Sequence, residues 1–197
     1  MLLYDSEVSG NCYKVRLLLA HLGLEYERYP MDVVDRSNRK EVLGDLNPGL
    51  RVPTLVLDDG RALGESGAIL WYLADGSEYV PEDEFDRAKV LQWMFFEQYS
   101  HEPYVAVPRF WLTHGIDVDP ETLAERRRVG YLAFDAMESH LAGHEYLAGD
   151  GYSIADIALY AYTHVAHEGG FDLEAYPSIG AWLARVAAQP GHVPIDA

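Results

Sequence analysis

The chain has 197 residues, of which 49% are hydrophobic, and a formal net charge of −17. No stretch approaches the roughly 18 apolar residues of a membrane-spanning helix, and so acidic a surface repels nucleic-acid backbones and anionic lipids. The single cysteine, Cys12, excludes an internal disulfide framework and a cysteine-only metal site, and it favours the reducing cytoplasm as the location.

The first 75 residues alternate short apolar runs with helical patterns. Residues 1–5 are typical of a buried strand, and residues 12–22 carry apolar side chains at helical spacing. The elements predicted after them are a strand over 26–33, a short helix over 37–46 capped by Ser37, a hairpin formed by 54–57 and 61–63, and a helix over 65–74. The order β-α-β-α-β-β-α predicts parallel first strands with an antiparallel edge.

The second part of the chain is helical throughout. Residues 76–84 are acidic, contain Gly and Pro, and are typical of a linker. The four helices predicted after them cover 85–106 with a bend at Pro103, 120–141, 153–165 and 177–188, and the chain ends in an extended tail. We therefore expect an α/β domain over 1–75 and an all-helical domain over 85–197, with a small-molecule site at their junction.

Four local motifs follow one another across nearly the whole chain. They are Ser9-Gly10-Asn11-Cys12-Tyr13-Lys14-Val15-Arg16, Asn47-Pro48 with Val52-Pro53-Thr54-Leu55, Glu65-Ser66-Gly67-Ala68-Ile69, and Ser153-Ile154-Ala155-Asp156. In this order and at these separations they resemble the cytosolic glutathione S-transferases, and the first motif is most similar to bacterial serine-type members of the theta, zeta and nu-like classes. The resemblance implies a thioredoxin-like N-terminal domain that binds glutathione as co-substrate, followed by an all-helical domain that contributes the electrophile pocket.

The resemblance makes Ser9 the hydrogen-bond donor to the glutathione sulfur. Its loop leads into a helix N-terminus, where unpaired N–H groups and the helix dipole favour an anion. Lowering a thiol pKa from about 8.5 to about 6.5 requires roughly 2.7 kcal/mol. A hydroxyl donor supplies about 1.5–3 kcal/mol and the helix end about 0.3–1, so no general base is needed. The alternative for Ser9 is a helix-capping serine without a catalytic role.

Two neighbours of Ser9 keep the assignment open. Asn11 is the rival donor, because some related bacterial proteins use an asparagine near this position; its alternative role is the N-cap of the helix. Cys12 lies where a helix N-terminus lowers a thiol pKa, which would permit a redox role. The alternative for Cys12 is a small buried residue in the first turn.

The other motifs are implied to hold the rest of glutathione. A cis bond between Val52 and Pro53 would expose the backbone of Val52 to the cysteinyl unit, as in an added strand. Arg51 is a candidate partner for a glutathione carboxylate. Lys40, with Arg39, is a candidate for the glycyl carboxylate, although we expect both side chains on a solvated charged face.

Glu65 and Ser66 suit the two charges of the γ-glutamyl group. Ser66 begins a helix and offers donors to the carboxylate, whereas Glu65 accepts from the ammonium. In the second half of the chain, Ser153 and Asp156 predict a structural capping box for a helix of the all-helical domain.

The resemblance also implies an electrophile pocket, for which Tyr104, Phe110 and Trp111 are candidates. We expect a glutathione transferase that needs no metal, acts on a small-molecule electrophile or disulfide and forms a homodimer with two-fold symmetry. The alternatives are a glutathione-dependent disulfide oxidoreductase, a cis-trans isomerase, and a non-catalytic protein of the same fold that binds ligands or partners.

Overall fold

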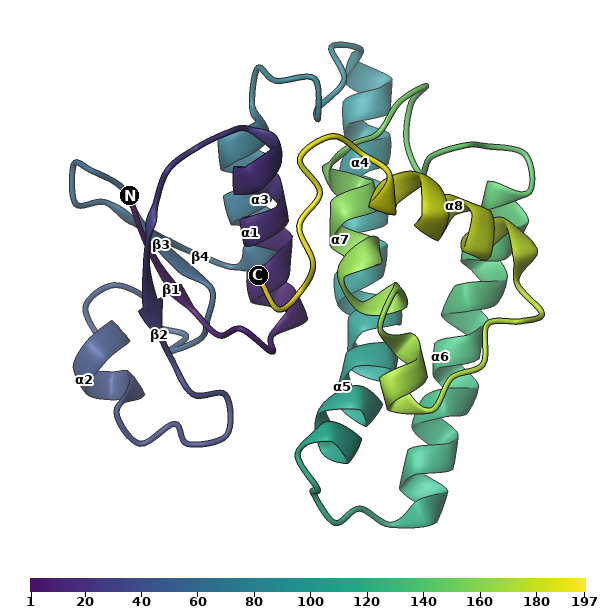
Figure 1. Ribbon diagram of the computed structural model, residues 1–197, viewed down its shortest axis with the longest axis horizontal. Helices are drawn as coiled ribbons and strands as arrows, with labels where there is room; N and C mark the ends of the chain where they lie inside the picture. Colours follow the sequence, from purple (N-terminus) through teal and green to yellow (C-terminus); the bar gives the residue numbers. More distant parts are fainter. The chain divides into compact units, whose positions relative to one another are not determined.

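In the computed structural model, which describes residues 1–197, the chain separates into two units (Figure 1). The first unit comprises Met1–Gly76 together with Pro190–Ala197, and the second comprises Ser77–Gln189. The last residues of the chain therefore pack with the first unit, although the helical unit precedes them in the sequence.

The first unit is a mixed four-stranded sheet with three helices. Its elements are, in chain order, β1 (Leu2–Asp5), α1 (Gly10–His21), β2 (Glu27–Pro30), α2 (Arg39–Leu43), β3 (Thr54–Val56), β4 (Ala62–Gly64) and α3 (Ser66–Ala74). The strand order is β2-β1-β3-β4; β1 and β2 are parallel, whereas β3 is antiparallel to both β1 and β4. The predicted thioredoxin-like arrangement, with a parallel first pair and an antiparallel hairpin at the edge, is confirmed.

The core of this unit fixes α1 and α3 against the sheet. The two helices contact each other (Figure 1). Their shared cluster consists of fully buried apolar side chains from β1, α1, β3 and α3, namely Leu3, Val15, Leu19, Leu55 and Ile69. Burying each such side chain is worth about 1.5–3 kcal/mol. The cluster therefore also fixes where the first turns of α1 and α3 lie.

The short elements of this unit differ from their predicted bounds. β2 covers only part of the strand predicted over 26–33, and α2 is shorter than the helix predicted over 37–46. The predicted cap is wrong, because Asn38 and not Ser37 precedes α2, and no side chain caps its first turn.

Arg39 is also placed differently from the prediction. Its side chain is buried and does not lie on a solvated face. The guanidinium donates to the backbone carbonyls of Leu50, at 3.0 Å, and Asp32, at 2.8 Å. Through these two bonds, Arg39 connects the loop after β2 to the loop before β3.

The second unit is helical. Its elements are α4 (Glu84–Phe96), a π-helical segment (Glu97–His101), α5 (Glu102–Thr113), α6 (Pro120–Leu141), α7 (Ile154–Thr163), a 3-10 turn (Ala166–Gly169) and α8 (Pro177–Ala187). α7 is buried along its whole length and contacts α4, α5 and α8. None of the helices combines the length and the apolar character that a membrane span requires.

Two of the predicted helices of this unit, those over 120–141 and 177–188, agree with the structure to within one residue. α6 has the predicted bounds, and the Asp119 side chain accepts from the N–H of Thr122 at 2.8 Å. The single helix predicted over 85–106 is wrong, since a π-helical segment divides it and α5 continues to Thr113. Pro103 causes no break there, because it occupies the first turn of α5, where a proline removes no helical hydrogen bond.

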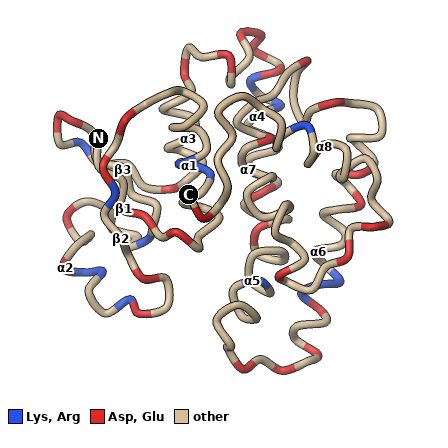
Figure 2. The backbone as a smooth tube through the Cα atoms, in the orientation of Figure 1, with Lys and Arg blue, Asp and Glu red and all other residues tan.

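Most of the negative charge lies in the second half of the sequence. Residues 76–197 carry 20 acidic and 7 basic side chains. The acidic positions recur along the loops and helices of the second unit (Figure 2). Like charges repel polyanions, which is the physical basis for expecting that this chain does not bind nucleic acid.

Candidate functional site

Ser9 begins the first helix and keeps its hydroxyl proton available. It is the N-cap of α1, with extended backbone angles, and its Oγ accepts from the N–H of Cys12 at 3.3 Å. Its own N–H donates to the carbonyl of Ser6 at 3.0 Å. Because a hydroxyl has one proton and two acceptor sites, Ser9 can cap the helix and donate to an anion at the same time. The two roles considered for Ser9 are therefore compatible.

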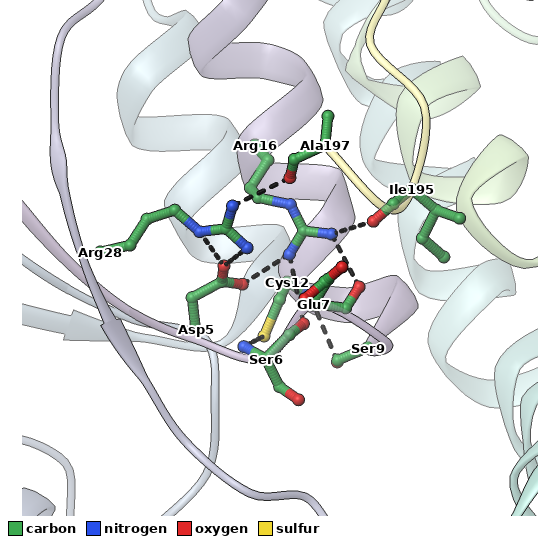
Figure 3. Close-up of polar contacts among 9 residues, drawn as sticks. All are labelled: Asp5, Ser6, Glu7, Ser9, Cys12, Arg16, Arg28, Ile195 and Ala197. Atoms are coloured by element: carbon green, nitrogen blue, oxygen red, sulfur yellow. Dashed lines mark hydrogen bonds and ion pairs between the residues drawn. The ribbon is translucent and has the colours of Figure 1, made fainter.

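A buried ion pair supports the loop before Ser9 (Figure 3). Arg16 Nη1 lies 2.6 Å from Asp5 Oδ1, and each side chain is only 2% exposed. The same guanidinium donates to the carbonyls of Ser6, at 3.2 Å, and Glu7, at 2.9 Å. Arg28 binds the other oxygen of Asp5 at 2.7 Å. The loop that carries Ser9 is therefore tied at several backbone positions to α1 and β1.

Asp5 was not predicted as part of this region, and Arg16 was predicted only as the last residue of the Ser9 motif, without its ion pair. A weak signal was present, since Asp5 ends an apolar strand and Arg16 interrupts the apolar face of α1. Charged residues are seldom fully buried unless they are paired, so two such positions on neighbouring elements indicate an ion pair.

Cys12 points into the protein interior. It is fully buried, and its Sγ accepts from the N–H of Ser6 at 3.4 Å. Burial, with a smaller effect from the charge of Asp5, raises the pKa of the Cys12 thiol to about 12. The thiol is therefore protonated at neutral pH and is a poor nucleophile.

Asn11 lies in the first turn of α1 and joins it to α3. It is not the N-cap, which is Ser9, so that alternative for Asn11 is wrong. Its Oδ1 accepts from Lys14 Nζ at 2.7 Å and from Ser66 Oγ at 3.3 Å. The second bond brings the first turns of α1 and α3 together, and with them the Ser9 motif and the Glu65-Ser66 motif.

Glu65 and Ser66 form the start of α3 in an unusual conformation. Glu65 precedes the helix with a φ of 65° and a ψ of 116°, and its side chain is exposed. A non-glycine residue at positive φ costs of order 1–3 kcal/mol, and such residues cluster at functional sites. No side chain caps α3, so its first N–H groups remain a suitable site for an anionic group.

The Val52–Pro53 bond is cis, as the family resemblance implies. Val52 lies outside every strand, and its backbone groups take part in none of the loop hydrogen bonds of the chain. The buried side chain of Asn47 supports this loop by donating to the Arg51 carbonyl, at 3.1 Å, and to Thr54 Oγ1, at 2.9 Å. The backbone of Val52 is thus held on a rigid loop and free to pair with an extended peptide.

The two other candidate cations in this unit are exposed. Arg51 extends from the loop before Pro53, and Lys40 lies on α2. No ion pair fixes either side chain in the structure, so both are free to approach a carboxylate.

The aromatic candidates lie on α5 in the second unit, and all three are half-buried. Tyr104 and Trp111 are seven residues apart and so share a face of the helix, with Phe110 beside them. The guanidinium of Arg126 lies 5.4 Å from the Tyr104 ring centre, and Phe110 packs against His114 at 4.6 Å.

Ser153 and Asp156 form a capping box at the start of α7. Both side chains are buried in the second unit. The structure contains no group of three or more His, Cys, Asp or Glu side chains arranged to hold a metal ion.

Comparison with known proteins gives both units a family. Residues 8–75 match the model of the glutathione S-transferase N-terminal domain, and residues 88–190 match that of the C-terminal domain. Glutathione S-transferase 3 of Zea mays is 30% identical, with 95% of this chain and 89% of that protein aligned. The disulfide-bond oxidoreductase YfcG of Escherichia coli is 25% identical, with 91% of this chain and 87% of that protein aligned.

One solved structure shares a higher sequence identity with this chain than these two relatives do. The crystal structure of a glutathione S-transferase from Pseudomonas fluorescens shares 50% sequence identity and covers 98% of both chains, with a TM-score of 0.95. The two domain models are matched in family order and together span most of the sequence. This chain therefore belongs to the glutathione S-transferase family and is a glutathione transferase.

Proposed function

We propose that this transferase stabilises the glutathione thiolate at the first turn of α1, with Ser9 and Asn11 as the donors to sulfur. The observation that carries the proposal is the hydrogen bond between Ser66 Oγ and Asn11 Oδ1. This bond joins the N-terminus of α1, which would receive the thiolate, to the N-terminus of α3, which would receive the γ-glutamyl carboxylate. The hydroxyl proton of Ser9, which its capping bond does not use, supports the same assignment.

The remaining contacts follow from the chemistry of the groups around this place. The uncapped backbone N–H groups in the first turn of α3, which begins at Ser66, receive the γ-glutamyl carboxylate, and Glu65 accepts from the γ-glutamyl ammonium. The unpaired backbone of Val52, before Pro53, binds the cysteinyl unit. Arg51 and Lys40 approach the glycyl carboxylate as solvated cations.

The reaction needs a thiolate and a positioned electrophile. One charge-assisted donor supplies about 1.5–3 kcal/mol and the helix end about 0.3–1, which together cover a fall of about two units in the thiol pKa. The sulfur then forms a bond to the electrophilic carbon, and the leaving group departs with its bonding electrons. Tyr104, Phe110 and Trp111 contact the electrophile, and holding both reactants supplies part of the rate gain.

The finer assignments are part of the same proposal. Ser9 as the N-cap of α1 supports membership of the bacterial serine-type classes. We expect the protein to form a homodimer with two-fold symmetry and to be located in the cytoplasm. Sedimentation equilibrium measures the mass of the assembly and so tests the dimer.

The test combines glutathione with a chromogenic aryl halide. Ser9→Ala and Asn11→Ala should each lower kcat/KM by about tenfold or more, because each removes a charge-assisted donor worth about 1.5–3 kcal/mol. The pH midpoint of kcat/KM should move upward in both variants. Ser37→Ala, an exposed serine before α2, is the matched control and should behave as the unmodified protein.

Two outcomes would contradict the proposal. An unchanged rate and pH profile in both variants would remove Ser9 and Asn11 from the chemistry. Glutathione binding by calorimetry without turnover of any electrophile would instead indicate a ligand carrier of the same fold.

A disulfide is the second candidate substrate, and the similarity to the oxidoreductase YfcG favours it. The bound thiolate would attack one sulfur of a mixed disulfide and release the other as a thiolate. Cys12 would take no part, because its thiol is buried and its pKa is raised to about 12. Turnover of a mixed disulfide by a Cys12→Ala variant tests this reaction.

A further inference from the structure

Lys14 is an unusual residue for its position in α1. Its side chain is only 1% exposed, and it lies one turn after Asn11, with which it shares a helix face. The ammonium donates to Asn11 Oδ1 at 2.7 Å. Lys14 is therefore a buried cation directly beside the proposed thiolate site.

Two physical effects act against a lysine at this place. Removing an ammonium from water is costly even when it is hydrogen-bonded, and an apolar side chain of similar size would often be more stable. The ammonium also reaches Asn11, the second residue of α1, and a positive charge at the first turn of a helix opposes the helix dipole. Features that break local rules in this way are expected at functional sites.

The hydrogen bond from Lys14 fixes the direction of the Asn11 amide. An ammonium has donors and no acceptor, so only the oxygen end of the amide can face it. Ser66 Oγ donates to the same oxygen at 3.3 Å. The NH₂ end of Asn11 must therefore point away from both groups, and it is the end that can donate to an anion.

We propose that Lys14 is a positioning residue for the transferase reaction, which holds the Asn11 amide so that its NH₂ group donates to the glutathione sulfur beside the Ser9 hydroxyl. The inference rests on the proposed function and adds the residue that orients the second donor. The positive charge of Lys14 also favours a nearby thiolate in surroundings from which water is partly excluded.

Three substitutions at one position separate positioning from packing. Lys14→Arg keeps obligatory donors, whereas Lys14→Gln can either donate or accept and no longer dictates which end of Asn11 faces it. Lys14→Met keeps the apolar stem without any donor. We expect Gln and Met to raise the pH midpoint of kcat/KM by about one unit, so that the rate below that pH falls about tenfold, and Arg to restore much of the loss. The control is Lys89→Met on α4, which should leave the rate and its pH profile unchanged.

A double-mutant cycle with Asn11→Ala provides the decisive readout. If Lys14 acts through Asn11, Lys14→Met should change kcat/KM far less in the Asn11→Ala background than in the unmodified one. Additive effects would overturn the positioning role, while the transferase mechanism through Ser9 would stand. Absence of turnover in the unmodified protein would instead contradict the proposed function itself. Should Lys14→Met fail to fold, the comparison of Arg with Gln carries the test, and equal pH profiles would overturn the proposal.

Discussion

At the scale of single residues, Cys12 is subject to two opposing effects. Its place in the first turn of α1 favours a thiolate, because the helix dipole and a donor N–H stabilise the negative charge. Complete burial acts in the opposite direction and is the larger effect, so the pKa of the Cys12 thiol rises to about 12. The same helix end can thus activate a sulfur that lies outside the protein interior and leave the internal one inert.

We predict that Cys12 reacts with an aromatic disulfide reagent far more slowly in the native protein than in denaturant, because both burial and the raised pKa suppress the thiolate. The measurement is the rate of labelling with and without denaturant. Cys12→Ala should keep kcat/KM and its pH profile. Rapid labelling of the native protein, accompanied by loss of activity, would contradict an inert thiol.

At the scale of elements, Asp156 connects several parts of the second unit. One carboxylate oxygen accepts from the N–H and the hydroxyl of Ser153, at 2.9 and 3.0 Å. The other accepts from the N–H of Leu147, at 3.0 Å, and from Trp182 Nε1, at 2.9 Å. Asp156 thus joins the start of α7 to the preceding loop and to α8, which is more than a helix cap alone provides.

Asp156→Ala should therefore lower the free energy of unfolding by about 3–5 kcal/mol, well above the ~1 kcal/mol of a lone cap, because it leaves several buried donors unsatisfied. Denaturant unfolding measures the loss. Protein that does fold should bind glutathione normally, since Asp156 lies in the second unit and Ser9 in the first.

The pH dependence gives Asp156 a second signature. Burial raises the pKa of this carboxyl to about 6 from an ordinary value of 3.8. The folded state then binds the proton more tightly than the unfolded state, so the contribution of Asp156 to stability is largest below about pH 4 and falls as the pH rises to about 6. Between about pH 4 and pH 6, the free energy of unfolding should therefore fall by about 3 kcal/mol through Asp156, and this fall should be absent in Asp156→Asn. A stability difference between the two proteins that is constant from pH 4 to pH 7 would contradict it.

Elements with local signals were predictable from the sequence. α6 matches its predicted bounds because a capping Asp119, a following Pro120 and helical periodicity all lie within the segment. β2 is shorter than predicted, since its length depends on pairing with β1, which no local pattern records. The π-helical segment at Glu97–His101 was not predicted for a similar reason. Its buried side chains pack according to the neighbouring helices, and the local sequence pattern does not record that packing.

Some parts of the candidate site were likewise predictable from the sequence, and others were not. The motif around Ser9 and the cis bond before Pro53 were accessible from the sequence through a family resemblance. The contacts that orient the site were not, because Asp5 with Arg16, and Asn11 with Ser66, meet only when separate elements pack together.

At the scale of the whole molecule, the end of the chain becomes part of the first unit. Pro190–Ala197 follows α8 but runs along α1 (Figure 1). Four of its backbone carbonyls accept from side chains of α1 and β2, and the pairs are Pro190 with His21 at 2.8 Å, Val193 with Tyr13 at 2.7 Å, Ile195 with Arg16 at 2.5 Å, and Ala197 with Arg28 at 2.9 Å. Since Arg16 also holds the Ser6 and Glu7 carbonyls, the tail is linked through one guanidinium to the loop of Ser9 (Figure 3).

Removing residues 190–197 should loosen this loop and weaken glutathione binding while the second unit keeps its stability. The reason is that Arg16 would lose the Ile195 carbonyl and become accessible to water, which weakens its buried pair with Asp5. Hydrogen exchange should show faster exchange at residues 6–9 and along α1, with no change in α7, and calorimetry should show a higher Kd for glutathione. Asp196→Ala, which keeps every tail carbonyl, is the matched control. If exchange at residues 6–9 is the same in the truncated and full chains, the Arg16 link does not support the loop, and the ion pair with Asp5 is sufficient by itself.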